Sequence, residues 1–452
     1  MAELDRDSLI APRISSPRDA GALAERLAAA APAAAGLPTH ARARVLRDVS
    51  LAIERDGEAF ARLICEEVRK PLKEARREVA RAAFTFRWAG EEARRFQGEL
   101  LPLDLDAQSE GRLALVRRFA RGPALLITPF NFPLNLVAHK VSAAIAVGAP
   151  FALKPAPQAP RTALRLGAIL ADCGWPAEAF AVAAGCPIDA AEALVRDERF
   201  AVLSFTGSAK VGWRLKGIAG KKHVVLELGG NAAVLVAADA DVPWAAARCA
   251  WGAYYYSGQV CISVQRILVE GSVYEEFRDL LLKNIAELKL GEPEDEGVDV
   301  GPLIDEQAAR RVEAWTQEAL ERGGRLLAGG QRRGLLIAPT LVENAPADCA
   351  LSREEAFGPV ATIERISSRA EGFERLASGS YGLQAGLFTN DLGAVFSAWP
   401  RLPIGGLIVN DIPSYRSDAM PYGGVKDSGL GREGARYAME EFTERRTLVL
   451  KP

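Results

Sequence analysis

The sequence lacks long hydrophobic runs, a secretory leader and an excess of either charge. No apolar run approaches the roughly eighteen residues that a membrane-spanning helix needs. The opening stretch, MAELDRDSLIAPRISS, has no hydrophobic segment between a basic start and a cleavage site. With 56 basic and 58 acidic residues, the formal charge of −2 provides no overall field for nucleic acid or an anionic membrane. We therefore expect a cytoplasmic protein that binds neither nucleic acid nor membrane.

Short cysteine spacings are also missing. The six cysteines are scattered along the chain, at positions 65, 173, 186, 249, 261 and 349. This spacing predicts neither a disulfide framework nor a zinc site. We expect free thiols and assign no metal ligand.

What the sequence does contain indicates a multidomain α/β protein. At 452 residues the chain is too long for one core, so we expect two or three globular domains. The residues up to about 96 have a helical pattern, with a helix expected over 39–70 after Thr39 as N-cap, and another over 71–96. From residue 112 onward, strand-like runs alternate with helix-like ones, which predicts a mostly parallel, doubly wound, Rossmann-like sheet.

The strand-like runs are RLALVRRFA, ALLIT, FALK, AFAVAA, AVLSF, HVVLEL and AAVLVA. A second α/β stretch follows residue 261, with helices expected near 273–288 and 305–322 and strands near 264–269, 335–337 and 360–363. The terminal RRTLVLKP and the earlier RLALVRRFA are strands of the kind that pair across subunits.

The run GLGREG, residues 429–434, matches the G-x-G-x-x-G dinucleotide pattern in its letters alone. No strand-like run precedes it, and the acidic residue expected about twenty positions later would fall at or beyond the chain end. We therefore reject it as a cofactor motif.

Cys261 stands between a glycine turn and a strand-like run, in YYYSGQVCISVQRILVE. On its own, such a cysteine is more often a packing residue than a nucleophile. Other motifs accompany it: TPFNFP, ALKPAPQAP, SFTGS and LELGGN upstream, and EEAFGPV and MPYGGVKDSGLGRE downstream. From about residue 17 to the C-terminus, these motifs in this order resemble the NAD(P)-dependent aldehyde dehydrogenase superfamily.

The resemblance implies that Cys261 adds to an aldehyde, that hydride then leaves to NAD or NADP, and that the resulting thioester is hydrolysed to the acid. Glu227 would act through water as the base, first for the thiol and later for the hydrolytic water. The side-chain amide of Asn131 and the Cys261 N–H would stabilise the oxyanion. Taken singly, Glu227 is also typical of a helix cap or a surface carboxylate, and Asn131 of a turn.

The resemblance also implies a cofactor site. Gly207 and Ser208 would present helix N-terminal amides to the pyrophosphate. The other implied contacts are the nucleotide wall Thr128, Pro129 and Phe130, the ribose-binding Lys154, and Glu355 with Phe357 on the nicotinamide side. Taken alone, the lysine is equally typical of a solvated loop.

The choice between NAD and NADP stays open at the sequence level. Many NAD-using relatives have a glutamate three residues after the ribose-binding lysine, where its carboxylate repels a 2′-phosphate. This chain has Pro157 at that position.

Three ionisable residues are expected to line the substrate tunnel: Arg87, His139 and Arg416. Together they would favour an aldehyde with a carboxylate, phosphate, phosphonate or hydroxyl at its far end. The alternative is local pairing, of Arg87 with the glutamates at 91 or 92 and of Arg416 with Asp418, with the histidine merely packed.

Phe132 and Tyr415 would supply apolar tunnel wall. Relatives that oxidise phosphorylated aldehydes often have arginine just before the nucleophile, where this chain has Val260. A short hydroxy- or carboxy-aldehyde is therefore the preferred substrate.

Three rival functions remain. The first is the coenzyme A-acylating branch of the family, which Glu227 disfavours because several acylating relatives lack a base there. The second is a non-catalytic protein that keeps the fold, and the third is a cysteine hydrolase without a cofactor, which would leave SFTGS and KPAPQAP unexplained.

The resemblance implies a cofactor domain over 1–101 and 122–228 and a catalytic domain over 229–427. A small β oligomerisation arm would comprise 102–121 and 428–452. The expected assembly is a homodimer or homotetramer.

Overall fold

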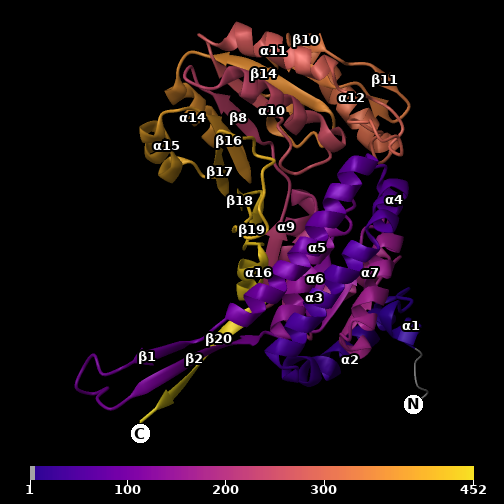
Figure 1. Cartoon of the computed structure of the whole chain (residues 1–452), viewed down its shortest axis with the longest axis vertical. Helices are drawn as coiled ribbons and strands as arrows, with labels where there is room; N and C mark the ends of the chain where they lie inside the picture. The colour runs from indigo at the N-terminus through magenta and orange to yellow at the C-terminus, as the bar shows by residue number, and fades with distance from the viewer. Residues whose placement is uncertain (1–5, 452) are drawn as a thin grey trace.

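The strand-like runs between residues 112 and 237 all form strands in the computed structural model, which describes residues 6–451. Their apolar and β-branched side chains suit a buried sheet. The chain builds two α/β bodies, the first drawn below and the second above in Figure 1, and a projecting three-stranded arm.

The first body contains a six-stranded sheet. Five strands are parallel, and only the short β19 runs antiparallel, beside β7. From β3 the chain runs outward through β4 and β5, then returns to the other side of β3 for β6 and β7. The strand order thus reverses between β3 and β6, and doubly wound sheets bind ligands at such a switch point. In sheet order the strands are β19 (Gly429–Leu430), β7 (His223–Glu227), β6 (Val202–Thr206), β3 (Ala124–Ile127), β4 (Phe151–Lys154) and β5 (Phe180–Val182).

Helices cover both faces of this sheet, because successive strand residues point to opposite sides. Leu126 packs in one core with α3 to α7, whereas Leu125 packs in another with α2, α8 and α9. The helices are α1 (Arg6–Ile10), α2 (Pro17–Gly36), α3 (Thr39–Arg55), α4 (Gly57–Val68), α5 (Leu72–Arg95), α6 (Asn135–Val147), α7 (Pro160–Asp172), α8 (Ile188–Arg196), α9 (Ala209–Ile218) and α16 (Ala435–Glu441).

The second body is built on a seven-stranded sheet. Helices α10 and α11 pack on one face against Val234, and α14 and α15 on the other face against Leu235. The strands in sheet order are β10 (Arg325–Ala328), β13 (Thr340–Glu343), β14 (Val360–Ile366), β9 (Arg266–Glu270), β8 (Ala233–Val236), β16 (Gln384–Phe388) and β17 (Gly406–Val409). The helices are α10 (Val242–Tyr254), α11 (Tyr274–Ala286), α12 (Glu306–Glu321), α13 (Ala350–Arg353), α14 (Arg369–Ala377) and α15 (Leu392–Ala398).

The helix expected over 39–70 is interrupted. Helix α3 ends before Asp56, which has φ −93° and ψ 15°, and α4 begins at Gly57, a weak helix former. Thr39 is the first helical residue and not the N-cap, because Pro38 stands at the cap in an extended conformation.

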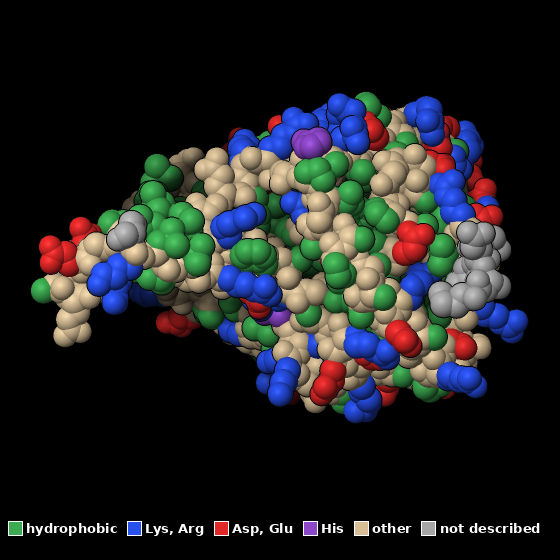
Figure 2. Space-filling view, turned by 90° about the horizontal axis from the view of Figure 1, so that it is seen from below, with side chains coloured by type: hydrophobic (Ala, Val, Ile, Leu, Met, Phe, Trp, Pro, Cys, Tyr) green, Lys and Arg blue, Asp and Glu red, His purple; other side chains and the backbone are tan. Residues whose placement is uncertain are grey.

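The arm is an antiparallel sheet of β1 (Glu99–Pro102), β2 (Leu113–Ala120) and β20 (Thr443–Leu450). It projects from the first body and ends near the C-terminus (Figure 1). Hydrophobic side chains gather on its surface in Figure 2, and Leu100 and Leu448 are 66% and 55% exposed. Strand β1 begins three residues before the expected arm boundary, and β19 and α16, expected in the arm, pack on the first body.

A buried ion pair joins α5 to the start of α6. The side chains of Lys70 and Glu78 pair directly and are 1% and 0% exposed. Glu78 also accepts hydrogen bonds from the backbone N–H of Leu134, at 2.8 Å, and of Asn135, at 3.0 Å. This carboxylate therefore replaces the side-chain cap that α6 lacks.

The same ion pair also contacts the second body, through Lys70. The Lys70 ammonium lies 3.7 Å from the ring centre of Phe132 and 4.4 Å from that of Tyr256. Phe132 belongs to the loop before α6, and Tyr256 to the turn after α10. One buried cation thus contacts both loops.

Glu78→Gln keeps the shape of the side chain but leaves the Lys70 ammonium buried without a counter-ion. We expect a loss of about 3–5 kcal/mol in the free energy of unfolding. Urea-induced unfolding checks this, with Glu91→Gln, at an exposed position on the same helix, as control. Equal midpoints for the two variants would contradict the prediction.

Candidate active site

A cleft of about 740 Å³ is lined by residues from both bodies. It brings together most of the residues that the motifs predicted, although they are spread over more than half of the chain. The predicted residues in its lining are Pro129, Phe130, Asn131, Phe132, Gly207, Ser208, Glu227, Val260, Cys261, Glu355, Phe357 and Arg416.

An unusual turn delivers Cys261 to this cleft. Tyr256, Ser257 and Gly258 have φ of 49°, 55° and 67°, three successive residues in the left-handed region. A Cβ on Gly258 would lie 2.1 Å from the carbonyl oxygen of Gly358, so only glycine fits there. The turn is held by the Ser257 hydroxyl, which donates to the Gly301 carbonyl at 2.6 Å.

The Cys261 sulfur lies 3.2 Å from the hydroxyl oxygen of Tyr422. Burial raises the pKa of this thiol to about 12, although the Tyr422 hydrogen bond and the charge of Arg416 lower it. The carboxylates of Glu355 and Glu227 add to the increase. The thiol is therefore protonated near neutral pH and needs a base before it can react.

Asn131 lies in the middle of the loop between β3 and α6, and its side chain is buried. Its Nδ2 donates to the carbonyl oxygen of Gln259 at 2.9 Å. This bond holds the amide beside the turn that carries the nucleophile candidate, since Gln259 is two residues before Cys261. Nδ2 has a second N–H that this bond does not use, and Asn131 lines the cleft.

Glu227 ends β7 and is buried, and neither of its carboxylate oxygens has a hydrogen-bond partner within residues 6–451. Burial, followed by repulsion from Glu433, raises its pKa well above the usual range, against the lowering by Arg416 and Lys140. A Cβ on Gly423 would lie 2.9 Å from Glu227 Oε1, so the chain passes close to the carboxylate. A buried carboxylate with a raised pKa is suited to accept a proton.

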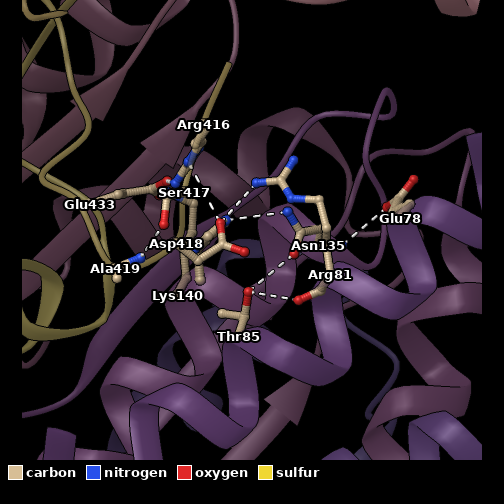
Figure 3. Close-up of polar contacts among 11 residues, drawn as sticks. Glu78, Arg81, Thr85, Asn135, Lys140, Arg416, Ser417, Asp418, Ala419 and Glu433 are labelled. Carbon is tan, nitrogen blue, oxygen red and sulfur yellow. Dashed lines mark hydrogen bonds and ion pairs between the residues drawn. The ribbon is translucent and has the colours of Figure 1, made fainter. Parts of the chain in front are cut away.

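A cluster of buried charges surrounds Glu433, the carboxylate that repels Glu227 (Figure 3). Lys140 donates to Glu433 at 2.8 Å, and Arg416 donates to the other oxygen of Glu433 at 3.2 Å. Burial alone would raise the pKa of Glu433, but Lys140 and Arg416 hold it down to about 2. The ionised Glu433 in turn disfavours the ionised form of Glu227.

The switch point of the first sheet opens into the same cleft. Gly207 and Ser208 follow β6, and Ser208 makes no side-chain cap bond, so the first amides of α9 are left for a ligand. On the far wall, Glu355 lies so close to Gly229 that a Cβ there would be 2.2 Å from its carboxylate. Burial raises the pKa of Glu355 to about 7, against the lowering by the Gly230 N–H.

Three of the expected cofactor residues lie at the carboxyl ends of β3 and β4, just outside the cleft lining. Thr128 is buried, and its N–H donates to the Lys154 carbonyl at 3.2 Å. Burial lowers the pKa of Lys154, whose ammonium donates to the Pro155 carbonyl at 3.4 Å. Pro157, three residues after Lys154, is exposed. This edge offers a dinucleotide the Lys154 ammonium and the Thr128 hydroxyl, which has no hydrogen-bond partner within residues 6–451.

The aldehyde dehydrogenase family model matches residues 6–448. The chain belongs to this family. A 3-sulfolactaldehyde dehydrogenase of Priestia aryabhattai is 41% identical over 406 residues, 90% of this chain and 85% of the relative. Aldehyde dehydrogenase 21 of Physcomitrella patens, solved with the reaction product succinate, is 42% identical with a TM-score of 0.94, over 97% of this chain and 91% of that one. Glyceraldehyde-3-phosphate dehydrogenase GapN of Methanocaldococcus jannaschii, solved with NADP, is 35% identical with a TM-score of 0.93, over 100% of both chains.

These likenesses confirm the predicted NAD(P)-dependent aldehyde dehydrogenase activity and the predicted α/β architecture with Rossmann-like parallel sheets. Within residues 6–451, no helix of this aldehyde dehydrogenase is long and apolar enough to cross a bilayer. All six cysteines are free thiols.

Three residues expected in the substrate tunnel of this aldehyde dehydrogenase lie elsewhere. The Arg87 side chain is 55% exposed and lies 3.6 Å from Glu54 on the neighbouring α3, because it is on the outer side of α5. His139 is buried behind the cleft, with Nε2 3.3 Å from Asp418. Tyr415 is 49% exposed and does not line the cleft.

Among the cleft residues that the sequence analysis did not assign, Arg81 and Tyr422 bear most directly on the chemistry. Arg81 is three residues after Glu78 and four before Thr85, so all three lie along one stripe of α5. That stripe was the available signal for choosing Arg81 over Arg87. Tyr422 lies inside the motif MPYGGVKDSGLGRE, but the sequence gave no sign that its hydroxyl meets the nucleophile.

Proposed function

We propose that this aldehyde dehydrogenase oxidises a short anionic aldehyde to its acid, with Cys261 as nucleophile and Glu227 as base. The observation that carries the proposal is the single cleft that contains Cys261, Glu227 and Asn131 beside the first amides of α9. The three side chains come from different elements, and packing alone gives no reason for a buried carboxylate without a partner.

Addition begins when Glu227, acting through water, takes the thiol proton of Cys261. The sulfur then bonds to the carbonyl carbon, and the C=O electron pair moves onto the oxygen. Two donors serve that oxygen: the second N–H of Asn131 Nδ2 and the backbone N–H of Cys261, which makes no hydrogen bond within residues 6–451.

A bound nicotinamide cofactor, held by Gly207, Ser208 and Glu355, would supply the hydride acceptor. Loss of hydride from the tetrahedral carbon would leave a thioester on Cys261. Glu227 then takes a proton from a water whose oxygen attacks the thioester, and the thiolate of Cys261 departs as the acid forms. A base in this position favours water as the acyl acceptor, which argues against the coenzyme A-acylating alternative.

The far end of the substrate meets Arg81 and Arg416, which both line the cleft. Asp418 holds the two guanidinium groups together, because its Oδ1 accepts from Arg81 at 2.8 Å and lies 3.9 Å from Arg416 Nε (Figure 3). Guanidinium groups bind carboxylates and sulfonates through paired hydrogen bonds. Of the three named relatives, one is a 3-sulfolactaldehyde dehydrogenase, one was solved with succinate and one is a glyceraldehyde-3-phosphate dehydrogenase, which supports a short anionic substrate.

Either nicotinamide cofactor fits the proposal. Position 157 has an exposed proline with no carboxylate to repel a 2′-phosphate. The relative solved with NADP supports NADP as an accepted cofactor.

We keep the predicted division into a cofactor domain, a catalytic domain and an arm, and propose that the arm joins copies of the chain into a homo-oligomer. Within the chain, β1 and β20 are edge strands with exposed leucines, and β17 is the free edge of the second sheet. Unpaired edges with apolar side chains favour pairing with another chain. The six free thiols support a reducing compartment such as the cytoplasm.

Replacing Glu227 by glutamine removes the base from both steps, so the thioester should form more slowly and its hydrolysis should nearly stop. We expect a burst of about one reduced cofactor per active site and a steady-state rate lower by about 10²–10⁴-fold. Cys261→Ala should abolish the burst, whereas Cys249→Ala, a buried thiol outside the cleft, should keep normal turnover. Stopped-flow absorbance of the reduced cofactor measures both phases. A burst in Cys261→Ala, or turnover that requires coenzyme A, would overturn the mechanism.

Arg81→Gln removes one guanidinium from the substrate wall. The KM for succinic semialdehyde should rise about tenfold or more, since a hydrogen bond to a charged group is lost, while the KM for propionaldehyde stays nearly constant. Initial rates with both aldehydes measure the difference. Arg87→Gln, on the outer side of the same helix, is the matched control and should change neither KM; equal effects of Arg81→Gln on both aldehydes would contradict the anion-binding role.

Leu448→Asp places a charge on the exposed face of β20. We expect the dissociation constant of the oligomer to rise by about tenfold or more, because a buried interface does not tolerate an unpaired carboxylate. Sedimentation velocity over a concentration series measures it. Leu51→Asp, at an equally exposed leucine of α3, should sediment as the wild type does.

A further inference from the structure

The hydroxyl group of Tyr422 has no part in the mechanism above, yet it lies beside the nucleophile. Tyr422 is 3% exposed, and Cys261 Sγ, at 3.2 Å, is the hydrogen-bond partner of its hydroxyl. The two residues are far apart in the sequence: Cys261 precedes β9, and Tyr422 lies in the segment that leads to β19. A phenylalanine would fill the same space without this contact.

The position of this hydroxyl is fixed from two sides. The backbone of Tyr422 pairs with that of Glu433, with N–H to carbonyl distances of 3.0 and 2.7 Å. The Arg416 guanidinium lies over the ring face, 3.7 Å from the ring centre. Because Glu433 also holds Arg416, ring and guanidinium form one rigid unit.

The direction of the hydrogen bond follows from the chemistry of the two groups. Burial raises the pKa of Tyr422 well above its usual range, so the phenol keeps its proton. An ionised sulfur has no proton and only accepts. Once Cys261 is ionised, the phenol is therefore the donor, and the cation over its ring makes the O–H a stronger donor.

We propose that Tyr422 is a positioning residue that donates a hydrogen bond to the ionised sulfur of Cys261 and holds it toward the cleft. The inference rests on the proposed role of Cys261 as nucleophile. The phenol proton is not transferred: the thiol proton goes to Glu227 through water, and the electron pair left on sulfur accepts the Tyr422 O–H.

Most of the groups around the Cys261 sulfur oppose its ionisation, so a hydrogen-bond donor is needed to stabilise the thiolate. Glu355 and Glu227 both oppose a negative charge on Cys261, and burial opposes it more strongly. Tyr255 also faces the sulfur and stays neutral because burial raises its pKa. The phenol of Tyr422, followed by the cation of Arg416, favours the thiolate.

Tyr422→Phe removes one oxygen atom and tests the proposal without cofactor or aldehyde. Loss of a hydrogen bond to a charged acceptor should raise the thiol pKa by about one to two units, and the greater basicity of the sulfur offsets about half of the effect on reactivity. Alkylation of Cys261 by iodoacetamide should therefore slow by about three- to tenfold at each pH from about 6 to 10. Mass spectrometry of the peptide with Cys261 separates it from the other five thiols.

A second measurement tests whether slower alkylation of Cys261 reflects only reduced access of the reagent to the sulfur. Alkylation by the bulkier N-ethylmaleimide should slow in Tyr422→Phe by about the same factor as alkylation by iodoacetamide, because a change in ionisation acts on both reagents alike, whereas a change in access acts more on the larger one. Tyr254→Phe is the matched control: this buried hydroxyl donates to the Thr340 carbonyl at 3.0 Å and does not line the cleft. It should leave both measurements unchanged, whatever it does to thermal stability.

Unchanged alkylation rates in Tyr422→Phe would overturn the proposal, as would an equal slowing in Tyr254→Phe. Because neither assay contains substrate, a failed screen of anionic aldehydes would count against the proposed function and not against this contact.

Discussion

The Lys70–Glu78 ion pair lies where the two halves of the active site meet, and both halves depend on it for their position. Glu78 caps α6 and so fixes the loop that presents Asn131, while Lys70 lies against the turn that leads to Cys261. Two charges this deeply buried are stable only as a pair, since either alone would face an uncompensated desolvation cost. Asn131 and Cys261, the proposed oxyanion donor and nucleophile, are therefore fixed relative to one another in part through a contact that touches neither.

Buried charge also sets the chemistry at the base. Glu227 and Glu433 are both buried, but Lys140 and Arg416 neutralise only Glu433. Two neighbouring carboxylates in one dry site are pushed apart in pKa, one ionised and one inclined to hold a proton. The arginine that binds substrate in the proposal thus also determines which carboxylate is the base.

The motifs selected Asn131, Glu227 and Cys261, which the structure brings into one cleft, because each follows a local strand or turn pattern. They misplaced the substrate wall, since the orientation of α5 is decided by Glu78 and Thr85, buried polar residues that apolar periodicity does not count. The contact of Tyr422 with Cys261 joins positions 161 residues apart, so it exists only after the segments have packed. The break at residue 56 was likewise hidden inside a continuous amphipathic pattern.

A protonated, enclosed sulfur has a consequence for the lifetime of the enzyme. Peroxide oxidises thiolates and hardly touches thiols, and each step toward sulfinic acid begins from the ionised form. With its pKa held at about 12, Cys261 presents little of that form except while a base is drawing its proton away. The same burial that makes the nucleophile slow to ionise therefore protects it from oxidative damage between turnovers.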